Sequence, residues 1–165
     1  MERPTMAQSR QGGSSRKRAT PGKAAKACAA ARKPWYAEGL RFECRQCGKC
    51  CGGEPGYIWL STAEIRSAAE ALGMHVLDFC SMYVAEYDRG FSLREKDTGD
   101  CCMLQGGQCT IYAVRPLQCR TWPWWPSNLR SPEAWQETGR RCPGVGEGRT
   151  WLPADIARQR DQLKI

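Results

Sequence analysis

The stretch CRQCGKCC at residues 44 to 51 places four cysteines within eight positions. Two residues separate Cys44 from Cys47 and Cys47 from Cys50, which lets one loop turn three thiolates toward a common centre. The same C-x2-C-x2-C run holds cubane iron–sulfur clusters. Gly48 can adopt a positive φ angle, so that backbone N–H groups of the turn point at the sulfurs. The run therefore predicts a thiolate metal site.

The spacing does not choose between metals. A C-x-x-C-G-K stretch also suits half of a tetrahedral zinc site, which then takes its other ligands from elsewhere in the chain. Cys51 follows Cys50 directly, without the spacer found in the ferredoxin run. Because adjacent side chains tend to point apart, we expect these two cysteines to serve different centres. Further thiols are available downstream at Cys102 and Cys109, which flank a predicted hairpin, and at Cys119 and Cys142.

Eleven of the 165 residues are cysteine, so the redox compartment decides what these thiols do. The sequence shows no secretory signal and no apolar run near the ~18 residues that predict a membrane span. We therefore expect a cytoplasmic protein, in which clustered thiols bind metal or do chemistry rather than form disulfides. A thioredoxin-like use of Cys44 and Cys47 needs a βαβ context, which the pattern lacks.

The basic charge is confined to an N-terminal tail, residues 1–34. This tail has nine Lys and Arg against one Glu and carries the whole formal net charge of +8. Its Ser, Gly, Ala and basic residues cannot bury enough surface to offset chain entropy, which predicts disorder. A solvated extension is the simplest interpretation. A transit peptide, or a weak contact with nucleic acid or an anionic surface, is the alternative.

After the tail, the patterns are those of short helices and hairpins. Ser61 and Glu64 have capping-box spacing and open an amphipathic helix that ends at Gly73. A second short helix is predicted over residues 76–84 from its helical spacing of apolar side chains. Residues 86–112 lose this period and predict short strands joined by tight turns.

These observations predict a small, cysteine-rich α+β domain with a disordered N-terminal tail. We place the metal-binding domain at residues 35–150 and a polar surface helix at residues 151–165. The domain is poor in large apolar side chains, so we expect one or two metal centres to supply much of its stability.

With these motifs in hand, the chain resembles the CxxCxxCC cysteine-cluster family, the YkgJ-like proteins described as zinc- or iron-chelating domains. The likeness covers about residues 40–146. It is carried by FECRQCGKCC at 42–51, STAEI at 61–65, CML at 102–104, CTIYAVRP at 109–116, CRTWP at 119–123 and CPG at 142–144. Three cysteines fall outside the pattern, namely Cys28, Cys80 and Cys101. The resemblance implies eight metal ligands: Cys44, Cys47, Cys50, Cys51, Cys102, Cys109, Cys119 and Cys142.

The resemblance implies a metal-chelating protein that binds an iron–sulfur cluster, for instance of the [4Fe–4S] type, or zinc. Two alternatives stay open. One is an iron–sulfur enzyme of the redox or protein-lysine methyl-transfer type, since relatives include larger flagellin lysine methylases. The other is a zinc-stabilised nucleic-acid-binding module that uses the basic tail. No catalytic residue stands out, because the single histidine, His75, lies between two predicted helices, where a capping or surface role is expected.

Overall fold

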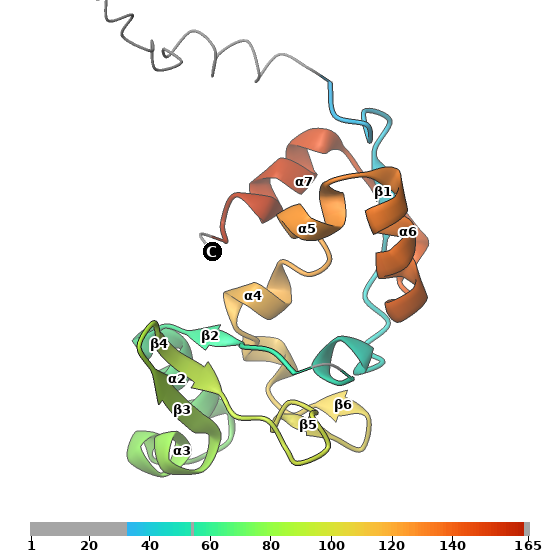
Figure 1. Cartoon of the computed structure of the whole chain (residues 1–165). Coiled ribbons are helices and arrows are strands. Elements are labelled where there is room, and N and C mark those ends of the chain that lie inside the picture. Colours follow the sequence, from blue (N-terminus) through green and yellow to red (C-terminus); the bar gives the residue numbers. More distant parts are fainter. Residues whose placement is uncertain (1–32, 54, 164–165) are drawn as a thin grey trace, which may run out of the picture. The chain divides into compact units, whose positions relative to one another are not determined.

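The computed structural model describes residues 33–53 and 55–163. Apart from Lys33 and Pro34, the predicted tail lies outside these residues. The described residues form short helices and short antiparallel strands, which confirms the α+β prediction (Figure 1). In chain order the elements are β1 (Leu40–Phe42), the 3-10 turn η1 (Lys49–Cys51), β2 (Trp59–Leu60), α2 (Thr62–Ala71), α3 (Val76–Tyr83), β3 (Val84–Tyr87), β4 (Gly90–Leu93), β5 (Leu104–Gln105), β6 (Gln108–Cys109), η2 (Tyr112–Val114), α4 (Leu117–Arg120), α5 (Pro126–Leu129), α6 (Pro132–Arg141), β7 (Val145–Trp151) and α7 (Pro153–Arg160).

Helix α2 begins at the capping box that the sequence predicts. Ser61 Oγ accepts a hydrogen bond from the Glu64 N–H at 3.3 Å, and the Glu64 carboxylate accepts one from the Ser61 N–H at 2.7 Å. The same carboxylate accepts a hydrogen bond from the N–H of Leu117, the first residue of α4, at 2.7 Å. Glu64 therefore fixes the start of α2 and also ties this helix to α4, which carries Cys119.

Glu64→Gln is expected to lower the free energy of unfolding by about 1 kcal/mol at pH 7, because a neutral amide is a weaker acceptor for these N–H groups. Burial raises the pKa of Glu64, but hydrogen bonds from Leu117 and Ser61 outweigh this effect and hold the pKa below 4.5. A lowered folded-state pKa gives stability that is present above the unfolded pKa and lost as the pH falls through the folded one. Urea unfolding should show the full difference between variant and wild type at pH 7 and a smaller one below about pH 4. A difference independent of pH would contradict this role.

A first apolar cluster lies between the sheet β2–β4–β3 and the helices α2 and α3. Strand β4 is central and pairs antiparallel with both neighbours. Ala69 of α2 and Phe79 of α3 have no exposed surface, and Leu93 of β4 is also buried. The remaining buried members are Leu60, Ile65, Ala68, Val84, Met103 and Ile111.

A second apolar cluster is built from the two ends of the described chain. Strand β1 pairs antiparallel with β7, and Leu40 lies opposite Trp151. Trp124 is buried and stacks on Trp135 of α6 with a centroid distance of 5.3 Å. Helix α7 lies in the segment that the sequence predicts to be a polar surface helix, and its Ile156 is fully buried in this cluster. The other buried members are Tyr36, Phe42 and Leu129.

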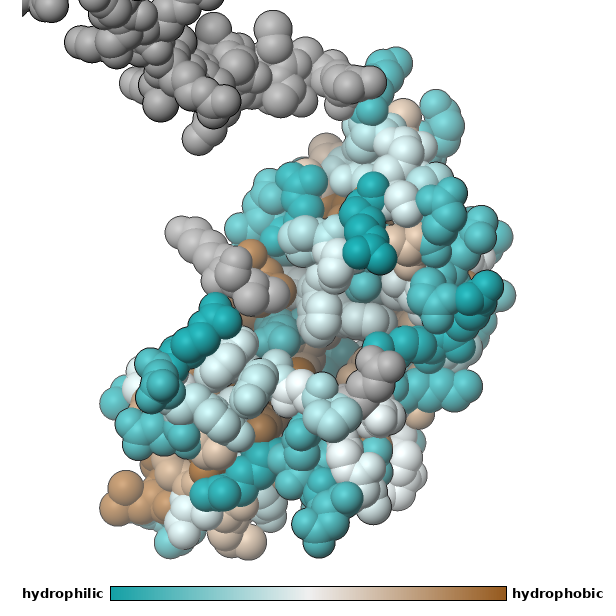
Figure 2. Space-filling view, viewed as in Figure 1, coloured by the Kyte–Doolittle hydropathy of each residue, from teal (hydrophilic) through white to brown (hydrophobic). Residues whose placement is uncertain are grey.

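The face in Figure 2 is largely hydrophilic, with apolar residues gathered over α3 at the lower left. Leu77 and Met82 of this helix are 71% and 57% exposed. Within the described ranges, no helix has the length and apolar character needed to cross a membrane.

Candidate metal centre

One cavity of about 520 Å³ collects most of the cysteines. Both apolar clusters contribute to its wall, the first through Leu93 and Met103 and the second through Phe42 and Trp124. All ten cysteines of the described part are free thiols. Eight of them line the cavity: Cys44, Cys47, Cys50, Cys51, Cys101, Cys109, Cys119 and Cys142.

The cysteine run occupies the loop after β1 and the turn η1. Gly48 precedes η1 with a φ of +72°, a left-handed conformation that favours glycine. A Cβ at this position would lie 2.5 Å from the carbonyl oxygen of Gly107 and 2.7 Å from Cδ1 of Leu104. Glycine thus lets the run pack closely on the β5–β6 hairpin, at whose end Cys109 lies.

A backbone contact brings the run to a second segment that contains cysteines. The N–H of Cys101 donates to the carbonyl oxygen of Cys51 at 2.7 Å. The sulfurs of Cys50 and Cys51 are 4.0 Å apart. The expectation that these adjacent side chains point apart is therefore wrong, because the tight 3-10 turn turns both sulfurs toward the cavity.

Cys142 reaches the cavity through the pairing of β1 with β7. It ends α6, and the Glu43 N–H donates to the Gly144 carbonyl oxygen at 3.1 Å. A Cβ on Gly144 would collide with the Glu43 carbonyl oxygen, so this approach requires glycine. The pairing brings the segments that follow β1 and precede β7 to one cavity, so that Cys44 and Cys142 both line it although 97 residues lie between them in sequence.

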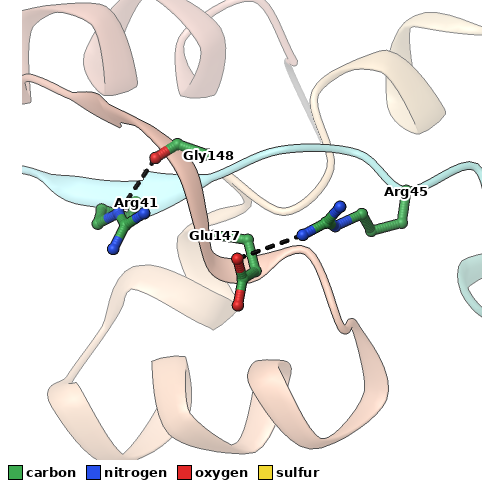
Figure 3. A network of polar contacts seen from close by, with 4 residues as sticks. All are labelled: Arg41, Arg45, Glu147 and Gly148. Atoms are coloured by element: carbon green, nitrogen blue, oxygen red, sulfur yellow. Dashed lines mark hydrogen bonds and ion pairs between the residues drawn. The ribbon is translucent and has the colours of Figure 1, made fainter.

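Two polar contacts also join the β1 segment to β7 (Figure 3). Arg41 Nε donates to the Gly148 carbonyl oxygen at 3.1 Å, and Arg45 forms an ion pair with Glu147 at 3.2 Å. Both partners of the ion pair are about half exposed, so its contribution to stability is below about 1 kcal/mol. The position of the ion pair matters more than its energy. Arg45 directly follows Cys44, so the ion pair ties the start of the cysteine run to Glu147 of β7.

Five of the cavity thiols influence one another electrostatically. A hydrogen bond from Cys51 lowers the pKa of Cys50 to about 7 and the pKa of Cys109 to about 6. Hydrogen bonding to these two thiolates raises the pKa of Cys51. Burial raises the pKa of Cys119 to about 12, and the negative charges of Cys101, Cys50 and Cys109 act in the same direction. Thiolate is the form in which sulfur binds metal, and Cys50 and Cys109 approach it near neutral pH.

Arg115 is the half-buried cation of the cavity. Its Nη1 lies 4.0 Å from the sulfur of Cys44, and its guanidinium carbon lies 3.6 Å from the ring centroid of Tyr112. Its charge contributes to the lowered pKa of Cys50 and of Cys109. A hydrogen bond with Cys44 raises the pKa of Tyr112. Arg115 therefore offsets part of the negative charge that gathers on the thiolates.

Two adjacent cysteines exchange the positions that the sequence pattern implies for them. Cys102, an expected ligand, is not part of the cavity wall; its sulfur donates to the Tyr83 carbonyl oxygen at 3.7 Å and packs on the first apolar cluster. Cys101, which falls outside the family pattern, lines the cavity instead. Cys80 packs on the first cluster, and Cys28 lies outside the described residues. Sequence reasoning had no signal for this choice. The two sulfurs are close enough for a hydrogen bond, which lowers the pKa of Cys101 and raises the pKa of Cys102, yet only Cys101 lines the cavity.

The donor set fits a zinc or iron centre. Thiolates are soft ligands that select zinc and iron–sulfur clusters. Zinc–sulfur bonds of ~2.3 Å in a tetrahedral site place the sulfurs ~3.8 Å apart, close to the spacing of Cys50 and Cys51. Among residues 33–53 and 55–163, no three His, Cys, Asp or Glu side chains are already close enough to hold one metal ion. The cavity thus gathers the ligands, and their final approach must accompany binding.

No solved structure matches this chain. A family model named CxxCxxCC, with the description "Putative zinc- or iron-chelating domain", matches residues 43–143. The matched segment spans more than half of the 165 residues and includes every cysteine of the cavity. The chain therefore belongs to the CxxCxxCC family.

Proposed function

We propose that this protein is a metal-chelating module whose cavity thiolates hold an iron–sulfur cluster in preference to zinc. The observation that carries the proposal is the convergence of eight thiols, from segments far apart in sequence, on one cavity of about 520 Å³. That volume greatly exceeds what a single zinc ion needs between its thiolates. The C-x2-C-x2-C spacing within the run is also typical of cubane clusters.

The proposed ligands are drawn from the cavity thiols, with Cys101 in place of Cys102 as a candidate, and one cubane cluster takes four of them. These thiols form two groups, according to whether they interact electrostatically with one another. The inner group, whose charges act on one another, is Cys50, Cys51, Cys101, Cys109 and Cys119. The outer group, from the loop after β1 and the end of α6, is Cys44, Cys47 and Cys142.

The remaining wall residues would tune such a centre. Arg115 places positive charge beside Cys44, which offsets the excess negative charge of bound thiolates. Trp122, Trp124 and Trp151 give the cavity an apolar wall that limits access of water. When bound, an iron–sulfur cluster supplies electron transfer or an open iron as a Lewis acid.

The chelating module is favoured over an enzyme because, among the described residues that line the cavity, the acid–base side chains other than thiols are only Glu43 and Tyr112, with no histidine. His75 caps α3, where its Nδ1 accepts a hydrogen bond from the Leu77 N–H at 3.3 Å. This agrees with the capping role expected for the residue. Because His75 is used as a cap, any chemistry of the proposed site would have to come from the metal centre itself.

A cytoplasmic location belongs to the same proposal, since a reducing compartment keeps clustered thiols available for metal. Contact of the basic residues 1–34 with nucleic acid or an anionic surface stays a prediction, because this tail lies almost wholly outside the described residues.

Anaerobic purification followed by metal analysis tests the proposed function. We expect a brown protein with broad absorption near ~400 nm and stoichiometric iron and acid-labile sulfide. A colourless protein with stoichiometric zinc would retain the chelating site and overturn the cluster. Folded protein with neither metal would overturn both.

A further inference from the structure

The cavity has room for more than a metal centre. If each of the eight inorganic atoms of a cubane cluster takes about the volume of a water molecule, ~30 Å³, the cluster fills roughly 240 Å³. This is less than half of the cavity's volume of about 520 Å³. At the same packing, the rest accommodates a small molecule of roughly nine non-hydrogen atoms.

Two residues of the cavity wall carry buried hydrogen-bond donors without acceptors. Nε of Arg115 and Nε1 of Trp122 find no hydrogen-bond partner in the part of the chain that the structure describes. Both nitrogens can only donate, so they require an acceptor. Buried donors are partnered in nearly all folded proteins because an unpaired one costs free energy. These two donors therefore indicate a ligand that brings acceptor atoms.

The charge of the wall favours an anion. Four arginines line the cavity, Arg45, Arg115, Arg120 and Arg149, against the single carboxylate of Glu43. Before any metal is bound, the lining thus carries three more positive than negative charges. Glu147, which pairs with Arg45, and a centre of four thiolates with a charge of about −2 together bring the whole site close to neutral. Among the described residues, Arg45 pairs with a carboxylate, whereas Arg115 forms no ion pair.

Flat apolar surfaces complete the same wall. Trp122, Trp124, Trp151 and Phe42 all line the cavity. Neighbouring rings hold these side chains in place. The ring centroids of Trp122 and Trp125 are 4.9 Å apart in an edge-to-face contact, and those of Trp124 and Trp151 are 5.2 Å apart. Pockets that combine aromatic walls with a few converging polar groups are typical of small-molecule sites. A planar, apolar body can pack against these rings.

We propose that the cavity binds, beside its metal centre, a small carboxylate with a planar apolar body, whose carboxylate accepts hydrogen bonds from Arg115 and Trp122. This inference rests on the proposed function, because the metal centre occupies the thiol side of the cavity and defines the space that remains. It assigns the site a ligand class, namely aromatic or similarly flat carboxylates.

Benzoate, which has nine non-hydrogen atoms, is a suitable probe for calorimetric titration of the metal-loaded, full-length protein. We expect saturable one-to-one binding, at least tenfold tighter than for benzyl alcohol, which lacks the charge, and for inorganic phosphate, which lacks the ring. Arg115→Gln and Trp122→Phe should each weaken benzoate binding at least fivefold. Arg66→Gln, an arginine of α2 that does not line the cavity, serves as the matched control and should bind as wild type does.

Metal content, measured on every sample, separates the two proposals. Full metal without benzoate binding overturns the carboxylate site and leaves the metal centre standing, whereas protein without metal overturns both. If benzyl alcohol binds as tightly as benzoate, the carboxylate charge plays no part in binding, which overturns the proposal of a carboxylate site. Trp122→Phe keeps a ring in place and removes only the donor, so unchanged benzoate binding by this variant excludes Trp122 even if Arg115→Gln loses its metal.

Discussion

Removal of the metal from the loaded protein is expected to lower its melting temperature by roughly 10 to 20 °C. Both apolar clusters contribute to the cavity wall, so a centre in the cavity joins them, and its binding free energy becomes folding free energy. A ligand present at about 1,000 times its Kd stabilises the folded state by about 4 kcal/mol. For a domain of this size, that free energy corresponds to a shift in melting temperature of the stated order.

The measurement is differential scanning calorimetry before and after anaerobic treatment with a chelator, with loss of metal checked by elemental analysis. Restored metal should restore the melting temperature. If the stripped protein instead melts at the same temperature as the loaded one, the metal does not connect the two clusters.

The second large effect is expected from a pair of adjacent substitutions. Cys101→Ser should lower metal affinity at least tenfold, because a neutral hydroxyl replaces a thiolate in the cavity wall. Cys102→Ser should leave metal content unchanged, because the Cys102 sulfur faces the Tyr83 carbonyl oxygen, to which a serine hydroxyl can also donate. Iron or zinc per protein, after identical anaerobic purification, is the readout.

This pair decides between the ligand implied by the family resemblance and the one that lines the cavity. Each variant is the natural control for the other, since the two residues are neighbours and lose the same sulfur. Metal loss in Cys102→Ser with full metal in Cys101→Ser would return the ligand role to Cys102. Equal loss in both would show that the segment, and not one sulfur, matters.

The apolar interior is larger than the composition indicates. The sequence leads to the expectation that metal, more than an apolar core, supplies the stability of this domain. The described part instead contains two clusters, with Phe79 and Ile156 fully buried in the first and second respectively. We therefore expect metal-free protein to retain helical structure, so that the drop in melting temperature measures the link between the clusters.

Local features of the fold could be predicted because their causes are local. The capping box at Ser61 and Glu64 lies within one helical turn and starts α2 as expected. The strands and turns between residues 86 and 112 follow from the loss of helical period. The prediction of a metal site from the cysteine run also rests on local spacing, and it stays a prediction.

What the sequence by itself determined is the class of protein: an α+β domain rich in thiols, with a C-x2-C-x2-C run and the pattern of the CxxCxxCC family. Only the tertiary structure decided which thiols share a cavity, that Cys101 and not Cys102 faces it, and that Arg115 and Trp122 bring donors to the same wall. The reason is physical. Spacing along the chain governs turns and helix faces. That Cys44 and Cys142 line one cavity depends instead on the pairing of β1 with β7, which joins segments about 100 residues apart and cannot be inferred from any short stretch of sequence.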